Sequence, residues 1–144
     1  MTSLDPSLAN RLEPRASAPE RRLAAIRYLA DAGVPVGVLV APVIPGLTDH
    51  ELPAILEAAR ANGAQFARYI LLRLPHGVSE IFSDWLERHA AAQRQKVLSR
   101  LREMRGGRLY EAQFGTRMRG EGVLAGQIEQ LFRLTCVKLG LPTR

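Results

Sequence analysis

The first half of the chain alternates between stretches of helical periodicity and short, wholly apolar runs. Four apolar residues at helical spacing predict a first helix: Leu23, Ile26, Leu29 and Ala30. Residues 17–20 before them read Ser-Ala-Pro-Glu, a capping box with proline in the first turn, and Gly33 supplies the C-terminal stop. The valine-rich run 34–41 that follows favours a strand buried on both faces, as in a parallel sheet.

This pattern then repeats. Residues 48–51 read Thr-Asp-His-Glu, a second capping box, and Gly63 ends the next helix 30 residues after Gly33. The run 66–74 predicts a further strand, closed by Pro75. Two helix–strand units in register indicate βαβ architecture. A short strand ending near residues 4–5 would complete a piece with three parallel strands.

The periodicity changes after Pro75, where helices are predicted around 81–86, over 91–104 and over 123–139. The last helix is expected to bury an apolar stripe of Ile128, Leu131, Phe132 and Val137. We therefore expect an α/β fold in which residues 1–78 form part of a β/α-repeat barrel and residues 79–144 form a helical C-terminal extension packed on it. Three parallel strands leave an exposed apolar edge, so we expect the rest of the barrel to be absent or supplied by a partner chain.

Composition narrows the class of protein. The 144 residues are 47% hydrophobic, and no apolar stretch is long enough for a membrane span, so no membrane partner is expected. The N-terminus shows no secretory signal, and a cytoplasmic location is expected. The single cysteine, Cys136, excludes a disulfide framework and a thiolate cluster site, and is predicted to be a packed core thiol. The histidines lack metal-ligand spacing, so no metal site is assigned.

The basic character of the chain is local. The net charge is +6, and residues 94–119 hold eight basic residues against two acidic ones, which accounts for all of it. Basic residues interleaved with aromatic residues are typical of nucleic-acid contact, although a charged helix is more often a solvated face. The residues proposed to bind nucleic acid are Arg100, Arg105, Arg108, Arg117 and Arg119.

Several motifs occur in an order that resembles a known family. They are Ser3-Leu4-Asp5, Glu13-Pro14-Arg15-Ala16, Arg21-Arg22-Leu23, residues 33–38, residues 41–51 (APVIPGLTDHE), Leu72-Arg73-Leu74-Pro75, Met104-Arg105-Gly106-Gly107 and Arg117-Met118-Arg119-Gly120. Together these resemble the C-terminal half of radical S-adenosylmethionine (radical SAM) proteins related to spore photoproduct lyase and the DNA repair photolyase-like group. The resemblance implies strands four to six of a partial (β/α)₆ barrel.

The resemblance also implies a cofactor set. In the family, a CxxxCxxC loop holds a [4Fe–4S] cluster that binds S-adenosylmethionine, and this chain has no such loop. The positions that match the S-adenosylmethionine pocket are Ser3, Arg15, Ala41, Pro42 and Val43. Arg73, at the end of the last predicted strand, is expected to face substrate, because active sites of such barrels lie at the C-terminal ends of their strands. Each also has a structural interpretation, as a strand-end hydroxyl, a solvent-exposed arginine or a buried strand.

Two functions remain open from the sequence. The first is a truncated radical SAM protein whose parent reaction is the reductive cleavage of S-adenosylmethionine at the cluster, with this chain alone inactive because it lacks the cluster cysteines. The second is a non-enzymatic basic module that binds nucleic acid or a partner chain.

Overall fold

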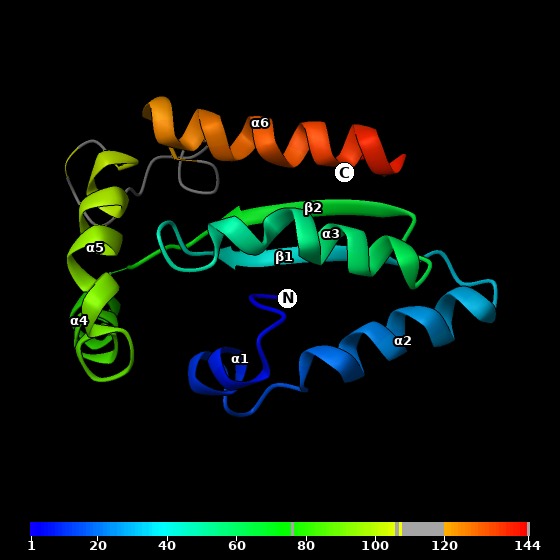
Figure 1. The fold of residues 1–144 in the computed structure, drawn as a ribbon, viewed down its shortest axis with the longest axis horizontal. Helices are drawn as coiled ribbons and strands as arrows, with labels where there is room; N and C mark the ends of the chain where they lie inside the picture. Colours follow the sequence, from blue (N-terminus) through cyan, green and yellow to red (C-terminus); the bar gives the residue numbers. More distant parts are fainter. Residues whose placement is uncertain (76, 106, 108–119, 144) are drawn as a thin grey trace.

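In the computed structural model, two parallel strands and the helix between them form the centre of the molecule (Figure 1). Residues 1–75, 77–105, 107 and 120–143 are described. In chain order, the elements are α1 (Pro6–Leu12), α2 (Pro19–Asp31), β1 (Gly37–Val43), the 3₁₀ turn η1 (Asp49–Glu51), α3 (Leu52–Ala61), β2 (Phe66–Leu71), α4 (Val78–His89), the 3₁₀ turn η2 (Ala91–Gln93), α5 (Arg94–Glu103) and α6 (Gly122–Leu139).

The strands β1 and β2 pair in parallel, from Gly37 beside Phe66 to Val40 beside Tyr69. The register is then irregular up to Val43, and the cis peptide bond between Ala41 and Pro42 lies within that irregular stretch. Parallel neighbours need a crossover connection, and α3 provides it. The βαβ unit expected from the sequence is therefore confirmed for these two strands.

One face of the sheet is covered by α3 and α6. The helix α3 buries Leu52, Ile55, Leu56 and Ala59, and α6 buries Ala125, Ile128, Phe132 and Cys136. The ring centroids of Tyr69 in β2 and Phe132 in α6 lie 4.7 Å apart, and this aromatic contact packs α6 against the sheet. Burial of such side chains contributes about 1.5–3 kcal/mol each, so this layer holds the core together.

The expectation of a partial barrel with three parallel strands is wrong. Among the described residues the sheet has two strands, and residues 1–4 are not a strand. They touch β1 through the Met1 amine and the Thr2 side chain, without a backbone ladder. Asp5 then caps α1, so the segment turns away before a ladder forms. The outer edge of β2 is met by the C-terminal segment, where the Ala67 N–H donates to the Pro142 carbonyl at 2.9 Å.

The helix ends and the apolar helix face predicted from the sequence are only partly confirmed. Gly33 and Gly63 follow α2 and α3 with positive φ, as predicted for helix stops, and the C-terminal helices are present. Neither capping box forms. The N-cap of α2 is Ala18, and Thr48, the N-cap of η1, makes no side-chain cap hydrogen bond. The stripe predicted for the last helix is also partly wrong, since Leu131 is exposed and Val137 is 71% exposed.

The short helix α1 is joined to α4 across a long sequence separation. The Trp85 indole Nε1 donates to the Arg11 carbonyl at 3.0 Å, and Arg11 Nη1 donates to the His89 carbonyl at 3.1 Å. Phe82 stacks on Trp85 with ring centroids 6.0 Å apart. Leu8 is the one residue of α1 that is buried. The hydrogen bonds to α4 therefore add to a small apolar contact in holding α1 in place.

Candidate functional site

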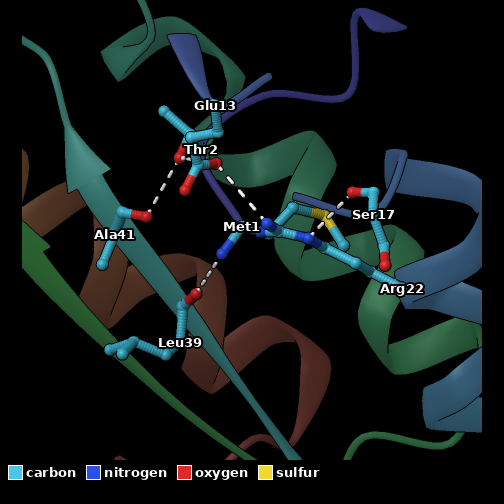
Figure 2. Close-up of polar contacts among 7 residues, drawn as sticks. All are labelled: Met1, Thr2, Glu13, Ser17, Arg22, Leu39 and Ala41. Carbon is cyan, nitrogen blue, oxygen red and sulfur yellow. Dashed lines mark hydrogen bonds and ion pairs between the residues drawn. The ribbon is translucent and has the colours of Figure 1, made fainter. Parts of the chain in front are cut away.

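The first two residues run along the outer edge of β1 (Figure 2). The Met1 amine donates to the Leu39 carbonyl at 2.6 Å. The Thr2 hydroxyl lies 3.0 Å from the Ala41 carbonyl and 2.9 Å from Glu13 Oε2, and it donates its single proton to one of them. Thr2 therefore links the strand edge to the residue that follows α1.

Beside this segment is an open cleft of about 400 Å³, including the part open to solvent. Its walls are the N-terminal segment, α1, the turn 16–18 and the first turns of α2. Arg22 in α2 points toward it, with Nη2 at 3.6 Å from Glu13 Oε2 and Nε donating to the Ser17 carbonyl at 3.1 Å (Figure 2). A carboxylate, a guanidinium and a hydroxyl thus meet at one wall.

The electrostatics of the cleft are set by this pair and by the Met1 amine. Burial, and then the nearby Arg22 guanidinium, lower the pKa of the Met1 amine, while Glu13 opposes the shift. The N-terminal end of α2, where a helix carries partial positive charge, also lies in the wall. The cleft therefore presents one cationic side and one carboxylate, which complements a zwitterionic ligand.

Ser3 lines the cleft, but its side chain is already bonded. The Ser3 hydroxyl donates to Glu51 Oε1 at 2.7 Å and accepts from the Asp5 N–H at 3.0 Å. The Leu4 N–H donates to Glu51 Oε2 at 2.7 Å. Glu51 thus ties residues 3 and 4 to η1, which explains why it does not close the predicted capping box.

The other residues matched to the cofactor pocket are not gathered in the cleft. Arg15 lies exposed in the turn between α1 and α2, outside the lining residues. Ala41 and Pro42 lie partly exposed at the end of β1, and the Ala41 carbonyl is reached by Thr2. Val43 is 1% exposed and packs in the core.

The sequence analysis assigned no site role to Thr2, Glu13 or Arg22, although Glu13 and Arg22 belong to motifs that carry the resemblance. The available signal was the Arg21-Arg22 pair in the first turn of α2. Adjacent helical residues point about 100° apart, so one of the two can face the chain that precedes the helix. The sequence pattern does not say which of them does so.

Arg73 lies partly buried just after β2. Of the arginines proposed for nucleic acid, Arg100 pairs with Asp49, with Nη1 at 3.5 Å from Oδ2. Arg105 is 3% exposed and its Nη2 donates to the Leu72 carbonyl at 3.1 Å. Both therefore make bonds within the chain. Arg108, Arg117 and Arg119 lie outside the described residues.

A thiolate cluster site is not found in the part of the chain that the structure describes. Cys136 is 1% exposed in α6, and burial raises the pKa of its thiol, as expected for a packed core cysteine. No group of three His, Cys, Asp or Glu side chains gathers as metal ligands within the same residues. None of the helices described is long and apolar enough to cross a bilayer.

No protein-family model matches the chain, and no solved structure matches it significantly. Matching curated proteins include uncharacterized proteins of Mycobacterium bovis and of two strains of Mycobacterium tuberculosis, each 34% identical over 102 residues. The match covers 69% of this chain and 29% of each relative, so the chain corresponds to under a third of the length of these relatives.

Proposed function

We propose that this chain binds S-adenosylmethionine and holds one side of it for a radical SAM reaction. The observation that carries the proposal is the convergence of Thr2, Glu13 and Arg22 in the cleft beside Ser3. The ordered motifs that resemble radical SAM proteins support it independently.

The donor set fits the amino-acid part of this ligand. A guanidinium binds a carboxylate through two parallel N–H groups, which suits Arg22 for the methionyl carboxylate. Glu13 would bind the α-ammonium group. The ligand carboxylate would thus replace Glu13 as the partner of Arg22, and the ligand ammonium would replace Arg22 as the partner of Glu13. The Thr2 hydroxyl, which both donates and accepts, suits a ribose hydroxyl.

The cluster does not fit this chain. Such clusters are held by several thiolates, whereas this sequence has one cysteine and the structure buries it. S-Adenosylmethionine supplies the adenosyl group that starts radical reactions in complete proteins of the family, and the ligands for iron must come from elsewhere. We therefore assign binding and orientation of the cofactor, and no chemical step, to these residues.

Isothermal titration of the purified chain with S-adenosylmethionine tests the proposal. We expect saturable binding that Arg22→Ala weakens by about 10- to 100-fold, because a hydrogen bond to a charged group contributes about 1.5–3 kcal/mol. Arg21→Ala is the matched control, since Arg21 is exposed and outside the cleft. Arg15→Ala separates the residue implied by the resemblance from the residue in the cleft.

Two results would overturn the proposal. One is a folded chain that shows no binding at millimolar S-adenosylmethionine. The other is equal weakening by Arg21→Ala and Arg22→Ala, which would indicate a general charge effect and not a specific site. Stronger loss from Arg15→Ala than from Arg22→Ala would move the carboxylate site to the turn before α2.

Binding of nucleic acid by the basic segment is a second proposal. It is supported by the exposed basic side chains of α5, Lys96 and Arg102, which lie on the solvent side of that helix. Phosphate contacts of this kind give salt-dependent, sequence-independent affinity.

A further inference from the structure

The Glu13 carboxylate of the cleft is attached to the end of a short helix. Glu13 directly follows α1, where its N–H donates to the Ala9 carbonyl at 2.8 Å and its carbonyl accepts from the Ala16 N–H at 2.9 Å. The backbone of Glu13 therefore moves with the C-terminal end of α1. A helix of seven residues is too short to be stable by itself, so contacts with the rest of the molecule must fix that end.

Two hydrogen bonds to α4 fix the end of α1. The Trp85 indole Nε1 donates to the Arg11 carbonyl at 3.0 Å, and Arg11 Nη1 donates at 3.1 Å to the carbonyl of His89, the last residue of α4. The carbonyls at a helix C-terminus lack partners within the helix, so the His89 carbonyl favours a cationic donor. Arg11 thus bonds to the last turn of α4 through both its backbone and its side chain, two residues before Glu13.

The α4 side of this contact is held by the core. Phe82 and Leu86 bury α4 against the rest of the molecule, and the Trp85 ring stacks on Phe82 with the ring planes 4° apart. Trp85 therefore has little freedom to follow α1 if α1 moves. The contact fixes Glu13 relative to the core, although Trp85 and Arg11 lie outside the residues that line the cleft.

The distance between the two charged groups of the cleft shows what the position of Glu13 controls. Glu13 Oε2 lies 3.6 Å from Arg22 Nη2, beyond the roughly 2.7–2.9 Å of a charge-assisted hydrogen bond. A Glu13 that could move closer would shorten this contact into a direct bond, which a ligand would then have to break. At the observed distance both side chains remain accessible, since Arg22 is 29% and Glu13 35% exposed.

We propose that Trp85 and Arg11 are positioning residues for the cleft. Their hydrogen bonds hold α1 so that Glu13 stays apart from Arg22 and remains available to the α-ammonium group of the ligand. This inference rests on the proposed binding of S-adenosylmethionine, to which it adds two residues that do not touch the ligand. Both residues act through Glu13, so their effect on affinity should vanish when the charge of Glu13 is removed.

A double-mutant cycle measured by isothermal titration of the full chain with S-adenosylmethionine tests this role. Trp85→Phe removes the indole donor and keeps an aromatic ring against Phe82, and we expect it to weaken binding by about 3- to 10-fold. In a Glu13→Gln background the same change should alter the affinity by less than about twofold. Arg88→Gln is the matched control and should leave the affinity unchanged, since Arg88 is exposed in the same turn of α4.

Variants of Arg11 test the second hydrogen bond without touching the core. Arg11→Ala shortens an exposed side chain, and it should weaken binding about as much as Trp85→Phe does. Arg11→Lys keeps a cationic donor for the His89 carbonyl and should restore most of the affinity. Circular dichroism checks that every variant folds.

NMR of the ligand-free chain adds a readout that does not depend on binding. Arg22 Nε–H donates to the Ser17 carbonyl, and its resonance reports the setting of the guanidinium beside Glu13. Trp85→Phe should shift this resonance, and Arg88→Gln should not.

The possible failures are distinguishable. An unaltered chain that binds no S-adenosylmethionine overturns the proposed function, and this role with it. If the unaltered chain binds, the role alone is overturned when Trp85→Phe leaves the affinity or the Arg22 resonance unchanged. It is also overturned when Trp85→Phe weakens binding equally in the Glu13→Gln background, because Trp85 would then not act through Glu13.

Discussion

The carboxylate of Glu51 accepts the Ser3 hydroxyl and the Leu4 N–H, both at 2.7 Å, across 48 and 47 residues of sequence. These two bonds fasten the N-terminal segment to η1 and thereby shape one side of the cleft. Hydrogen bonds to a charged acceptor contribute more to stability than bonds to a neutral one. Loss of the Glu51 carboxylate would leave the buried Ser3 hydroxyl without the acceptor for its proton.

We therefore predict that Glu51→Ala lowers the free energy of unfolding by about 2–4 kcal/mol, measured by urea denaturation. Glu57→Ala is the matched control on the same helical segment. Its carboxylate pairs with Lys138 at 3.6 Å on the exposed surface, so the change should stay within about 0.5 kcal/mol. Equal losses in the two variants would mean that the Ser3–Glu51 bond does not hold the segment.

Two glycine-to-alanine changes should act in opposite directions. A Cβ on Gly37 would clash with the Phe66 ring, whereas one on Gly126, inside α6, would meet nothing within 4 Å. Gly37→Ala should destabilise by about 1–3 kcal/mol through overpacking. Gly126→Ala should stabilise by roughly 0.5–1 kcal/mol through helix propensity. Thermal denaturation of both variants measures the signs, and Phe66→Ala should relieve the first effect.

The thiol of Cys136 should be unreactive in the folded chain. Burial raises its pKa and hides it from solvent, so the reactive thiolate is scarce and inaccessible. Labelling with a chromogenic disulfide at pH 8 should be slow in buffer and complete within minutes in 6 M guanidinium (about the concentration that unfolds most domains). Immediate labelling of native protein would mean that α6 does not pack on the sheet as described.

Arginines between residues 94 and 119 should differ in their effect on stability according to their burial. Arg105 is buried and bonded to the Leu72 carbonyl, so Arg105→Ala should cost about 2–4 kcal/mol of stability. Arg102 is exposed, so Arg102→Ala should leave stability within about 0.5 kcal/mol. If α5 binds nucleic acid, Arg102→Ala should weaken binding of double-stranded DNA and reduce the salt slope by about one. Unchanged binding at low salt would count against that proposal.

The sequence pattern predicted the elements whose signals are local. The glycine stops after α2 and α3, the two paired strands and the C-terminal helices follow from periodicity and turn chemistry. The capping box at residues 48–51 failed because the carboxylate of Glu51 is taken by Ser3 and Leu4, far away in the sequence. No local pattern carries that information.

The candidate site was predictable only in outline. Ser3 lines the cleft, and its role at a cofactor stays a prediction. Arg22 was missed because the direction of a helical side chain depends on how α2 docks. Half of the stripe predicted for α6 failed for the same reason. Leu131 and Val137 have suitable spacing, yet the helix turns Ile128, Phe132 and Cys136 toward α3 and the sheet.

The bond between Trp85 and the Arg11 carbonyl gives the molecule a built-in optical reporter. Trp85 is the single tryptophan of the chain, and its indole reports on whether α1 is seated against α4. Helix α1 also lines the cleft, through Ala9 and Asn10. The emission wavelength of Trp85 and its quenching by iodide therefore report whether α1, one wall of the cleft, is packed against α4. They do so in unlabelled protein, in real time and at micromolar concentration.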